Sequence, residues 1–314
     1  LNPHSRCNCR CLMCDIWRAN ANSRELSAEQ IESHIDKLQK LGVRSVLLTG
    51  GEALMHSDLW RLCQVLHPLG ARTTLLSTGL LLRKEREGIK QWIDEVIVSL
   101  DGDPETHDKI RNIPRAFERL AAGVQSLREY APHIDISARC VLQRHNFRRF
   151  EAIVASARDL QLDSISFLAA DVSSTAFNRP ERWGEDKVSE ISLSAEECDA
   201  LERILEESFH RLNDEYASGF IAEQPRKMQQ IVAHYRAING TGSPVRQRCN
   251  APWVSSVIEA DGSVRPCFFH PELGNLRESS LPEILNSRRA IEFRKNLDVS
   301  VDPVCSGCTC TLNV

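Results

Sequence analysis

The sequence of 314 residues predicts an α/β fold: a partial (β/α)6 barrel of parallel strands, TIM-like but open, followed by a small carboxyl-terminal domain. Short runs of β-branched and apolar residues alternate with amphipathic helical stretches from residue 43 onward, as in repeated strand–helix units. Counting a strand at or just before residue 1, about six units fit, fewer than a closed barrel needs. The alternation stops near residue 170, and a Cys-rich segment begins at Cys249.

Five strands are predicted, at 43–49, 72–77, 95–100, 134–141 and 164–169. The first helix begins after Ser27, because Ser27 and Gln30 form a capping box ahead of apolar residues at helical spacing. Further helices are predicted at 58–69, 84–92, 116–128 and 148–160. Because the carboxyl ends of parallel strands meet at one edge of the sheet, motifs that follow these strands are expected to lie together.

The rest of the chain divides into a connecting region and a second domain. Residues 171–192 are polar and without a period, which predicts a functional loop, and helices follow from Ser194 and near Gln224. Residues 1–245 are therefore assigned to the barrel with its connecting helices, and residues 246–314 to the second domain. That domain is predicted to contain a hairpin at 253–267 that turns at Asp261-Gly262, a helix at 282–295 and a Cys-rich tail.

The composition excludes several classes of partner. The formal net charge of −4 gives no field that would recruit nucleic acid. No apolar run approaches the roughly 20 residues needed to span a bilayer, so no membrane partner is expected. Twelve cysteines in a chain without a visible secretory signal favour metal or redox chemistry in a reducing cytoplasm over structural disulfides.

Three cysteines near the start of the chain, Cys7, Cys11 and Cys14, stand in C-x3-C-x2-C spacing. An iron–sulfur cluster normally takes four cysteines, so three thiolates would leave one iron of a cubane open to a small chelating molecule. A structural zinc site with a fourth ligand elsewhere, such as His4, is the alternative. The spacing alone leaves both open.

Two strand exits carry further candidate residues. Gly50, Gly51 and Glu52 follow the first strand, where glycines allow a ligand to approach the backbone and a carboxylate can hold an ammonium group. Ser99 and Asp101 end the third strand, where an Asp can hold sugar hydroxyls. In isolation the Gly-Gly exit is most often only a turn, and the Asp exit is equally well explained as a turn or a helix cap.

Two more strand-tip residues and the tail complete the set. Ser77 ends the second strand, and Arg139 is either a carboxylate clamp or a member of a surface ion pair. In the tail, two cysteines bracket the hairpin and a C-x2-C pair follows, which gives a closed site of four thiolates: Cys249, Cys267, Cys305 and Cys308. Cys310 is an alternative to Cys308, and a zinc knuckle is the alternative to an iron–sulfur cluster.

Together these motifs resemble those of the radical S-adenosylmethionine (SAM) superfamily, from Cys7 through about residue 169. The C-x3-C-x2-C loop, the Gly-Gly-Glu exit and the Ser-x-Asp-Gly exit occur in the family's order. The tail resembles the twitch type of auxiliary-cluster domain, a shorter relative of the SPASM domain. This resemblance implies a SAM-binding [4Fe–4S] cluster, SAM itself and one auxiliary [4Fe–4S] cluster as cofactors.

The resemblance also implies roles for individual residues. The first cluster would be held by Cys7, Cys11 and Cys14, and the auxiliary cluster by the four tail cysteines. SAM would be contacted at its amino group by Gly50, Gly51 and Glu52, at its ribose by Ser99 and Asp101 with Ser77 nearby, at its carboxylate by Arg139, and at its adenine by Met13 and Leu168. Met13 departs from the family, in which an aromatic residue is common at this position.

The implied chemistry is reductive cleavage of SAM to a 5′-deoxyadenosyl radical that abstracts a substrate hydrogen. An auxiliary cluster could then accept an electron, so we expect oxidation of a polar small molecule such as a sugar, aminocyclitol or nucleoside, with flavodoxin or ferredoxin as electron donor. Asp171, just past the fifth predicted strand, and His270, after Cys267, are the candidate bases. A solvated Asp and a surface His are the alternatives for these two residues.

Other functions remain open at this point. A peptide-modifying enzyme would use the same core, but it often carries two auxiliary clusters and a leader-recognition module ahead of the first cysteines, and neither is visible in this sequence. Epimerisation or decarboxylation of a small molecule is a further option. A non-catalytic zinc-binding interaction protein belongs to a different class and would be colourless.

Overall fold

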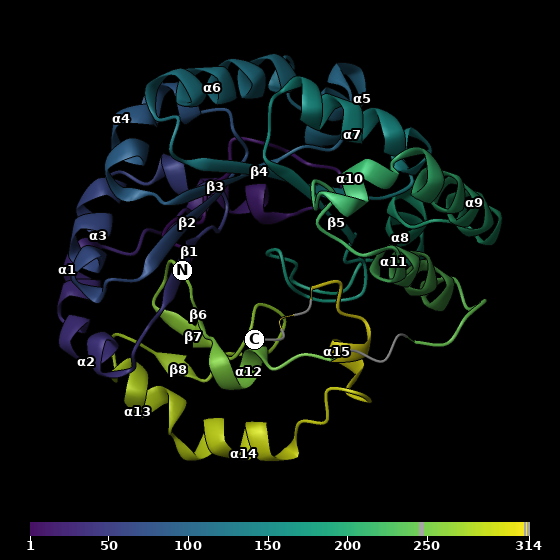
Figure 1. The fold of residues 1–314 in the computed structure, drawn as a ribbon. Helices are drawn as coiled ribbons and strands as arrows, with labels where there is room; N and C mark the ends of the chain where they lie inside the picture. Colours follow the sequence, from purple (N-terminus) through teal and green to yellow (C-terminus); the bar gives the residue numbers. More distant parts are fainter. Residues whose placement is uncertain (245–247, 311, 313–314) are drawn as a thin grey trace.

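The core of the protein is a parallel sheet in which each strand pairs with the next one along the chain (Figure 1). The computed structural model describes residues 1–244, 248–310 and 312. The five strands are β1 (Ser45–Leu48), β2 (Arg72–Ser77), β3 (Glu95–Ser99), β4 (Asp135–Leu142) and β5 (Ser164–Ala169). All five predicted strands are present, and the α/β fold is confirmed.

Helices cover the outer face of this curved sheet (Figure 1). They are α1 (Ala28–Glu32), α2 (Ile35–Lys40), α3 (Leu59–Leu66), α4 (Leu82–Trp92), α5 (Pro104–Arg111), α6 (Ala116–Tyr130) and α7 (Phe150–Asp159). Short 3-10 helices accompany them: η1 (Ile16–Asn22), η2 (Ala53–Met55), η3 (His67–Leu69) and η4 (Phe147–Arg149).

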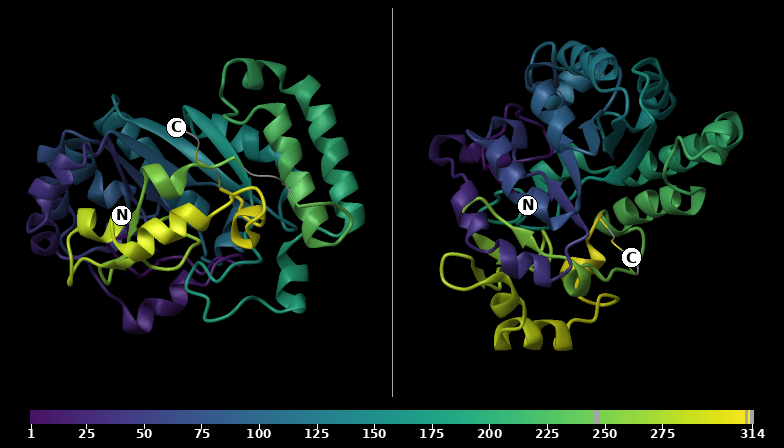
Figure 2. Two further views of the ribbon diagram at one scale, coloured as in Figure 1. Left: turned by 90° about the horizontal axis from the view of Figure 1, so that it is seen from below. Right: turned by 60° about the vertical axis from the view of Figure 1, so that its left-hand side comes forward.

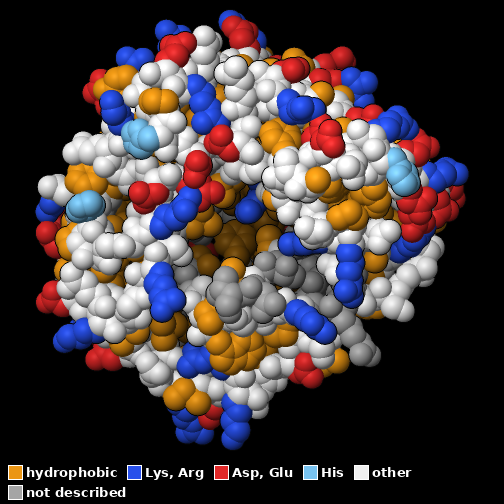
Figure 3. Space-filling view, in the orientation of Figure 1, with side chains coloured by type: hydrophobic (Ala, Val, Ile, Leu, Met, Phe, Trp, Pro, Cys, Tyr) orange, Lys and Arg blue, Asp and Glu red, His pale blue; other side chains and the backbone are white. Residues whose placement is uncertain are grey.

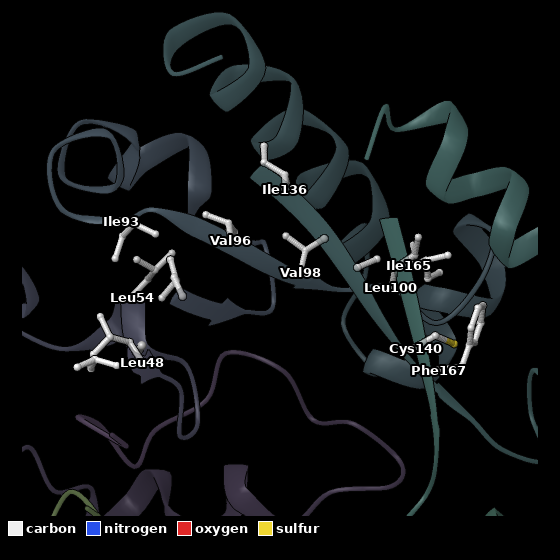
Figure 4. Packing of buried hydrophobic residues seen from close by; sticks show 14 of the residues in the cluster. Leu48, Leu54, Ile93, Val96, Val98, Leu100, Ile136, Cys140, Ile165 and Phe167 are labelled. Carbon is white, nitrogen blue, oxygen red and sulfur yellow. The ribbon is translucent and has the colours of Figure 1, made fainter. Parts of the chain in front are cut away.

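The strand sequences alternate because only one face of the sheet packs against these helices. In β4, Ile136, Ala138 and Cys140 are buried, whereas Ser137 and Arg139 between them are half-buried. Figure 4 shows the apolar side chains from neighbouring strands gathered in this core. The alternate residues, Arg139 among them, are therefore left to the concave face.

The first residues of the chain run in extended form beside β1. His4 forms an isolated parallel bridge with Gly50, and the Arg6 carbonyl oxygen accepts from the Glu52 N–H at 2.7 Å. The strand predicted at or just before residue 1 is therefore present as an extended segment with a bridge, and not as a strand of its own among the described residues.

Neither α5 nor the helix at 185–191 was predicted. The helix α5 begins at Pro104 and is capped by Asp103, whose side chain accepts from the Thr106 N–H. It has few apolar residues, which is why its periodicity is weak. The helix α8 (Glu185–Ile191) lies in the polar segment predicted as loop, so that prediction was wrong for its second half.

Beyond β5 the chain forms α9 (Ala195–Arg211), α10 (Asn213–Ala217) and α11 (Pro225–Ile238). The predicted capping box at Ser194 is present. The Ser194 side chain accepts from the Glu197 N–H, and the Glu197 carboxylate accepts from the Ser194 N–H. The predicted domain boundary between residues 245 and 246 lies outside the described residues.

The carboxyl-terminal segment contains a small antiparallel sheet and short helices. Its elements are α12 (Ala251–Val254), β6 (Val257–Ile258), β7 (Ser263–Arg265), β8 (Gly274–Asn275), α13 (Leu281–Leu285), α14 (Arg288–Asn296) and α15 (Pro303–Ser306). The predicted hairpin turn at Asp261-Gly262 is confirmed between β6 and β7. Its first arm was predicted too long, since residues 253–254 belong to α12, and the helix predicted at 282–295 is two helices.

This segment lies across the open side of the barrel, opposite α4 and α6 (Figures 1 and 2). The Asn2 N–H donates to the Ile258 carbonyl oxygen at 2.8 Å, and Arg24 pairs with Asp261 at 3.0 Å. Figure 3 shows a hollow at the centre of this face, with Lys and Arg side chains at its rim. In the described part of the chain, no helix is both long and apolar enough to cross a membrane.

Candidate active site

The amino-terminal thiols lie in a loop that follows the extended segment. Each of the three predicted ligands receives a weak hydrogen bond at sulfur: Cys7 from the Cys9 N–H at 3.5 Å, Cys14 from the Ile16 N–H at 3.5 Å and Cys11 from Arg111 Nη1 at 3.6 Å. Hydrogen-bond donors that point at sulfur stabilise the thiolate form of a cysteine ligand. The loop is therefore built to hold three thiolates.

The three amino-terminal thiols do not lie as close together as the ligands of a single zinc ion would. In the described residues, three or more potential ligand atoms come within 4.8 Å of one another only at His270, Asp302 and Cys305. Thiolates that share one tetrahedral zinc would be roughly 3.8 Å apart, so the three amino-terminal thiols are not arranged that way. The Nδ1 atom of His4, the suggested fourth ligand, lies 3.2 Å from the Arg24 carbonyl oxygen.

Burial and mutual repulsion oppose charge on these sulfurs. Burial raises the pKa of Cys7 to about 12, and the neighbouring Cys11 adds to this shift. A hydrogen bond with Cys9 and the nearby Arg111 guanidinium instead lower the pKa of Cys11. Three thiolates in this loop would therefore need a bound cation or cluster to compensate their charge.

Asp101 forms a buried ion pair. Its Oδ2 lies 2.6 Å from Nη2 of Arg111, with both side chains at or below 8% exposure, and its Oδ1 accepts from the Val141 N–H at 3.1 Å. In this arrangement the carboxylate is engaged by the protein itself. Its predicted contact with the SAM ribose stays a prediction, as does that of Ser99, which is half-buried at the end of β3.

Glu52 is fully buried and ties two strand exits together. Its carboxylate accepts from the Ser77 hydroxyl at 3.0 Å, the Thr78 N–H at 2.7 Å and the Leu54 N–H at 3.1 Å. Burial raises the pKa of Glu52, although these hydrogen bonds oppose the shift. The Thr78 hydroxyl also donates to Asn8 Oδ1 at 2.9 Å, which links Glu52 to the cysteine loop. Its predicted contact with the SAM amino group stays untested.

Gly50 and Gly51 are required by the chain's own packing. Gly50 has φ of 110°, and a Cβ there would lie 2.7 Å from the His4 carbonyl oxygen. A Cβ on Gly51 would overlap the Arg6 carbonyl oxygen. The sequence predicted close approach of a ligand at these glycines, and the group that approaches in this structure is the segment leading to Cys7.

Arg139 and Leu168 occupy the concave face of the sheet. Arg139 Nε donates to Ser166 Oγ of β5 at 3.4 Å. The charge of Arg139 acts to lower the pKa of Cys310 in the tail, so these two side chains lie near each other. The concave face of the barrel and the Cys-rich tail therefore border the same space.

The loop after β5 joins the two thiol-bearing regions. Arg179 Nη1 and Asp171 Oδ2 form a fully buried ion pair at 2.8 Å. Arg179 Nη2 also donates to the Met13 carbonyl oxygen at 3.3 Å, and Phe177 packs on Phe268, with ring centroids 5.0 Å apart. Met13 precedes Cys14 and Phe268 follows Cys267, so residues 171–184, here named the bridging loop, contact both regions. The predicted role of Asp171 as a base stays untested.

The tail cysteines converge around the end of the small sheet. Charge interactions connect Cys267, Cys305 and Cys308 with Cys249, so the four predicted ligands share one neighbourhood. Cys249 Sγ accepts from the Leu312 N–H at 3.5 Å. This donor set fits an iron–sulfur cluster.

His270 is buried and lies against this group. Its Nε2 is 3.4 Å from Cys305 Sγ and 3.9 Å from the nearest carboxylate oxygen of Asp302. The alternative of an exposed surface His is therefore wrong, because this side chain is buried and its ring packs on Phe293 of α14. Its predicted role as a base stays a prediction.

Sequence reasoning missed several residues of the site. No role was predicted for Arg111, and Arg179 and Trp183 lie in a segment with no periodic signal. Trp183 donates from Nε1 to Asp15 Oδ2 at 2.7 Å and stacks under the Arg179 guanidinium. A paired Arg and Trp in an otherwise irregular segment was the available signal.

Comparison with known families agrees with this geometry. Residues 1–165 match the radical SAM superfamily, and residues 249–309 match SPASM, an iron–sulfur cluster-binding domain. This chain belongs to the radical SAM superfamily. The radical SAM enzyme accordingly has a SAM-binding [4Fe–4S] cluster, SAM and an auxiliary iron–sulfur cluster as cofactors.

Several curated relatives are similar over most of this radical SAM chain. The Fe-coproporphyrin III synthase of Methanosarcina barkeri is 27% identical, covering 90% of this chain and 72% of the relative. An AdoMet-dependent heme synthase of the same organism is 27% identical, covering 96% and 88%. The subtilosin biosynthesis protein AlbA of Bacillus subtilis is 25% identical, but the match covers only 58% of AlbA against 90% of this chain.

The fold is shared with solved structures. The structure of anSMEcpe with bound AdoMet superposes with a TM-score of 0.71, at 18% identity, over 98% of this chain and 85% of that one. At this identity the similarity establishes the fold only. It confirms the predicted barrel with a carboxyl-terminal domain.

Proposed function

We propose that this radical SAM enzyme oxidises a small molecule, with the auxiliary cluster as acceptor of one substrate electron. The first cluster would be held by Cys7, Cys11 and Cys14. When bound, this cluster and SAM supply reductive cleavage of the sulfonium, giving methionine and a 5′-deoxyadenosyl radical that abstracts hydrogen. The tail thiols would hold the auxiliary cluster, which when bound would supply the acceptor for the second electron of the oxidation, while a base of the protein would take the substrate proton.

The observation that carries this proposal is the bridging loop. It contacts Met13 beside one set of thiols and Phe268 beside the other. A substrate lying between the two sets would be bordered by both, and the buried Arg179–Asp171 pair would keep the loop closed against water. Oxidation needs both proximity and exclusion of water.

A small polar substrate is supported by the concave face and by the relatives. Ser137, Arg139 and Ser166 present polar groups from β4 and β5. Two relatives that cover nearly the whole chain are named for synthesis of a coproporphyrin and of heme, which are carboxylate-bearing small molecules. A carboxylate-bearing substrate therefore joins the sugars, aminocyclitols and nucleosides expected from the sequence.

Peptide modification is the second candidate. AlbA is named for biosynthesis of the bacteriocin subtilosin, and a relative from Ruegeria pomeroyi, 25% identical over 88% of this chain, is named PqqA peptide cyclase. Either reaction would draw its first electron from a donor such as flavodoxin or ferredoxin in a reducing cytoplasm.

The test is anaerobic reconstitution followed by incubation with SAM, reductant and panels of candidate small molecules and peptides. We expect a brown protein, release of 5′-deoxyadenosine, and product two electrons more oxidised than the substrate. Cys267→Ala should still cleave SAM but should not complete the oxidation, whereas Cys63→Ala, in α3, should retain both steps. A colourless protein that takes up only zinc would refute the catalytic proposal, and turnover of peptides alone would establish the second candidate.

A further inference from the structure

Arg111 ends α5 with a guanidinium that is buried between a carboxylate and a thiol. Its Nη2 lies 2.6 Å from Asp101 Oδ2, and its Nη1 donates to Cys11 Sγ at 3.6 Å. Its Nε has no hydrogen-bond partner in the described structure. Two different nitrogens make these contacts, so the cation stands between the Asp101 carboxylate and the Cys11 sulfur.

The backbone fixes the same relationship. The Arg10 N–H donates to the Arg111 carbonyl oxygen at 3.0 Å, and the Leu12 N–H donates to the Ile110 carbonyl oxygen at 3.0 Å. These carbonyls belong to the last turn of α5, where a helix leaves its acceptors unsatisfied. The two donors flank Cys11, so the end of α5 holds this cysteine from both sides.

Burying the Arg111–Asp101 ion pair costs desolvation free energy. An ion pair removed from water gains little net stability, since desolvation opposes the attraction. A simple structural role could be filled by apolar packing. The orientation of this pair, with its positive end against a sulfur, instead has a direct electrostatic consequence for whatever that sulfur binds.

We propose that Arg111 is a positioning residue that raises the reduction potential of the amino-terminal cluster, and that Asp101 moderates this effect. The proposal rests on the assignment of Cys11 as a cluster ligand under the proposed function. Reduction adds a negative charge to the cluster, and a buried cation beside a ligand sulfur stabilises the reduced form. The Asp101 carboxylate carries the opposite charge, and the Arg111 guanidinium stands between it and Cys11. Asp101 therefore offsets only part of the stabilisation.

The functional consequence concerns the electron donor. A radical SAM cluster must be reduced before SAM can be cleaved, and low-potential clusters are difficult for ordinary donors to reduce. A higher potential widens the range of donors that can deliver the electron. It also lowers the driving force for transfer from the cluster to SAM, so the Arg111–Asp101 pair would balance the two steps.

The test is a potentiometric titration followed by electron paramagnetic resonance on anaerobically reconstituted protein without SAM. A Cys305→Ala/Cys308→Ala background removes the auxiliary signal, and iron content verifies that the first cluster is present. In Arg111→Gln the midpoint should become more negative by about 59 mV, a tenfold smaller equilibrium constant for a one-electron couple. Arg111→Lys should restore part of the shift, because it keeps the charge.

Asp101→Asn is the second test variant, because it should make the midpoint potential of the amino-terminal cluster more positive. A merely structural pair would give no such opposite signs. Arg115→Gln, which removes an exposed guanidinium paired with Glu118, should leave the midpoint unchanged.

Unchanged midpoints in both Arg111→Gln and Asp101→Asn, at normal iron content, would overturn the inference. If Arg111→Gln takes up no iron, the Lys and Asn variants decide it. Absence of any cluster in the Cys305→Ala/Cys308→Ala protein that keeps Arg111 and Asp101 would instead refute the proposed function. The two failures are therefore distinguishable.

Discussion

Arg179 donates from Nη2 to the carbonyl oxygen of Met13 at 3.3 Å, which fastens the bridging loop to the backbone beside Cys14. The same guanidinium pairs with Asp171 and stacks on Trp183 with 3.7 Å between Arg179 Cζ and the ring centroid. One fully buried cation thus satisfies groups from the cysteine loop and from its own loop. The position of the bridging loop against the cysteine loop therefore depends on the Arg179 side chain.

Arg179→Met should therefore strongly destabilise the protein. Removing one partner of a buried ion pair leaves the other charge unpaired, at a cost of about 3–5 kcal/mol. Anaerobic denaturant unfolding measures this loss. Arg179→Met/Asp171→Leu should recover most of the stability, because neither charge is then left alone. A double variant no more stable than the single one would show that the ion pair is not the cause.

The same pair allows the predicted base to be examined. If Asp171 removes the substrate proton, Asp171→Asn should still release 5′-deoxyadenosine while the oxidised product disappears. If Asp171 only closes the loop, both should fall together, as in Arg179→Met. The ratio of 5′-deoxyadenosine to product therefore separates chemistry from structure.

Gly51→Ala should displace the segment that leads to the first cysteines. Its new methyl group would overlap the Arg6 carbonyl oxygen, a backbone atom that cannot rotate away. Overpacking of this kind costs about 1–3 kcal/mol, and iron uptake at the amino-terminal site should fall. Gly184→Ala is the matched control, because a Cβ there meets nothing within 4 Å. Equal iron content in both variants would argue against this packing role.

The sequence predicted the sheet well because short β-branched and apolar runs between amphipathic helical stretches mark the strands. The ranges of β2 and β5 agree with the predicted ones, and the polar residues at the exits of β1 and β2 do converge. The partners of those residues could not be predicted. Asp101 is met by Arg111 from a helix with little apolar signal, and Glu52 is met by donors of another strand exit, Ser77 and Thr78. Such pairings depend on three-dimensional contacts that no local pattern encodes.

The tail offers five cysteines for four positions, and both Cys308 and Cys310 lie near the other tail thiols. The C-x2-C spacing from Cys305 favours Cys308 as the fourth ligand. Cys308→Ala should therefore lose the auxiliary cluster, lowering iron by about four per chain for a cubane. Cys310→Ala should keep it. Iron analysis and the visible absorption spectrum measure both, and the reverse outcome would make Cys310 the ligand.

A buried neutral histidine should make stability depend on pH. Burial, aided by the Arg111 charge, lowers the pKa of His107 to about 3, from 6.5 when unfolded. Between these values the unfolded chain binds a proton that the folded chain does not, so the free energy of unfolding decreases as the pH falls below 6.5. The loss is about 1.4 kcal/mol per pH unit, or about 2 kcal/mol at pH 5.

In the wild type, His107 Nδ1 accepts a hydrogen bond from the Asp101 N–H at 3.2 Å. His107→Gln removes the titrating ring, and the Gln side chain can still accept this hydrogen bond. The variant should be less stable than the wild type at pH 7.5, because the ring is fully buried, but the difference should narrow by about 2 kcal/mol at pH 5. Other titrating groups, the thiols included, are common to both proteins and cancel in this comparison. His133→Gln, at an exposed position, should follow the wild type at both pH values. Parallel curves for wild type and His107→Gln would mean that His107 takes up a proton in the folded protein, which its buried position next to Arg111 opposes.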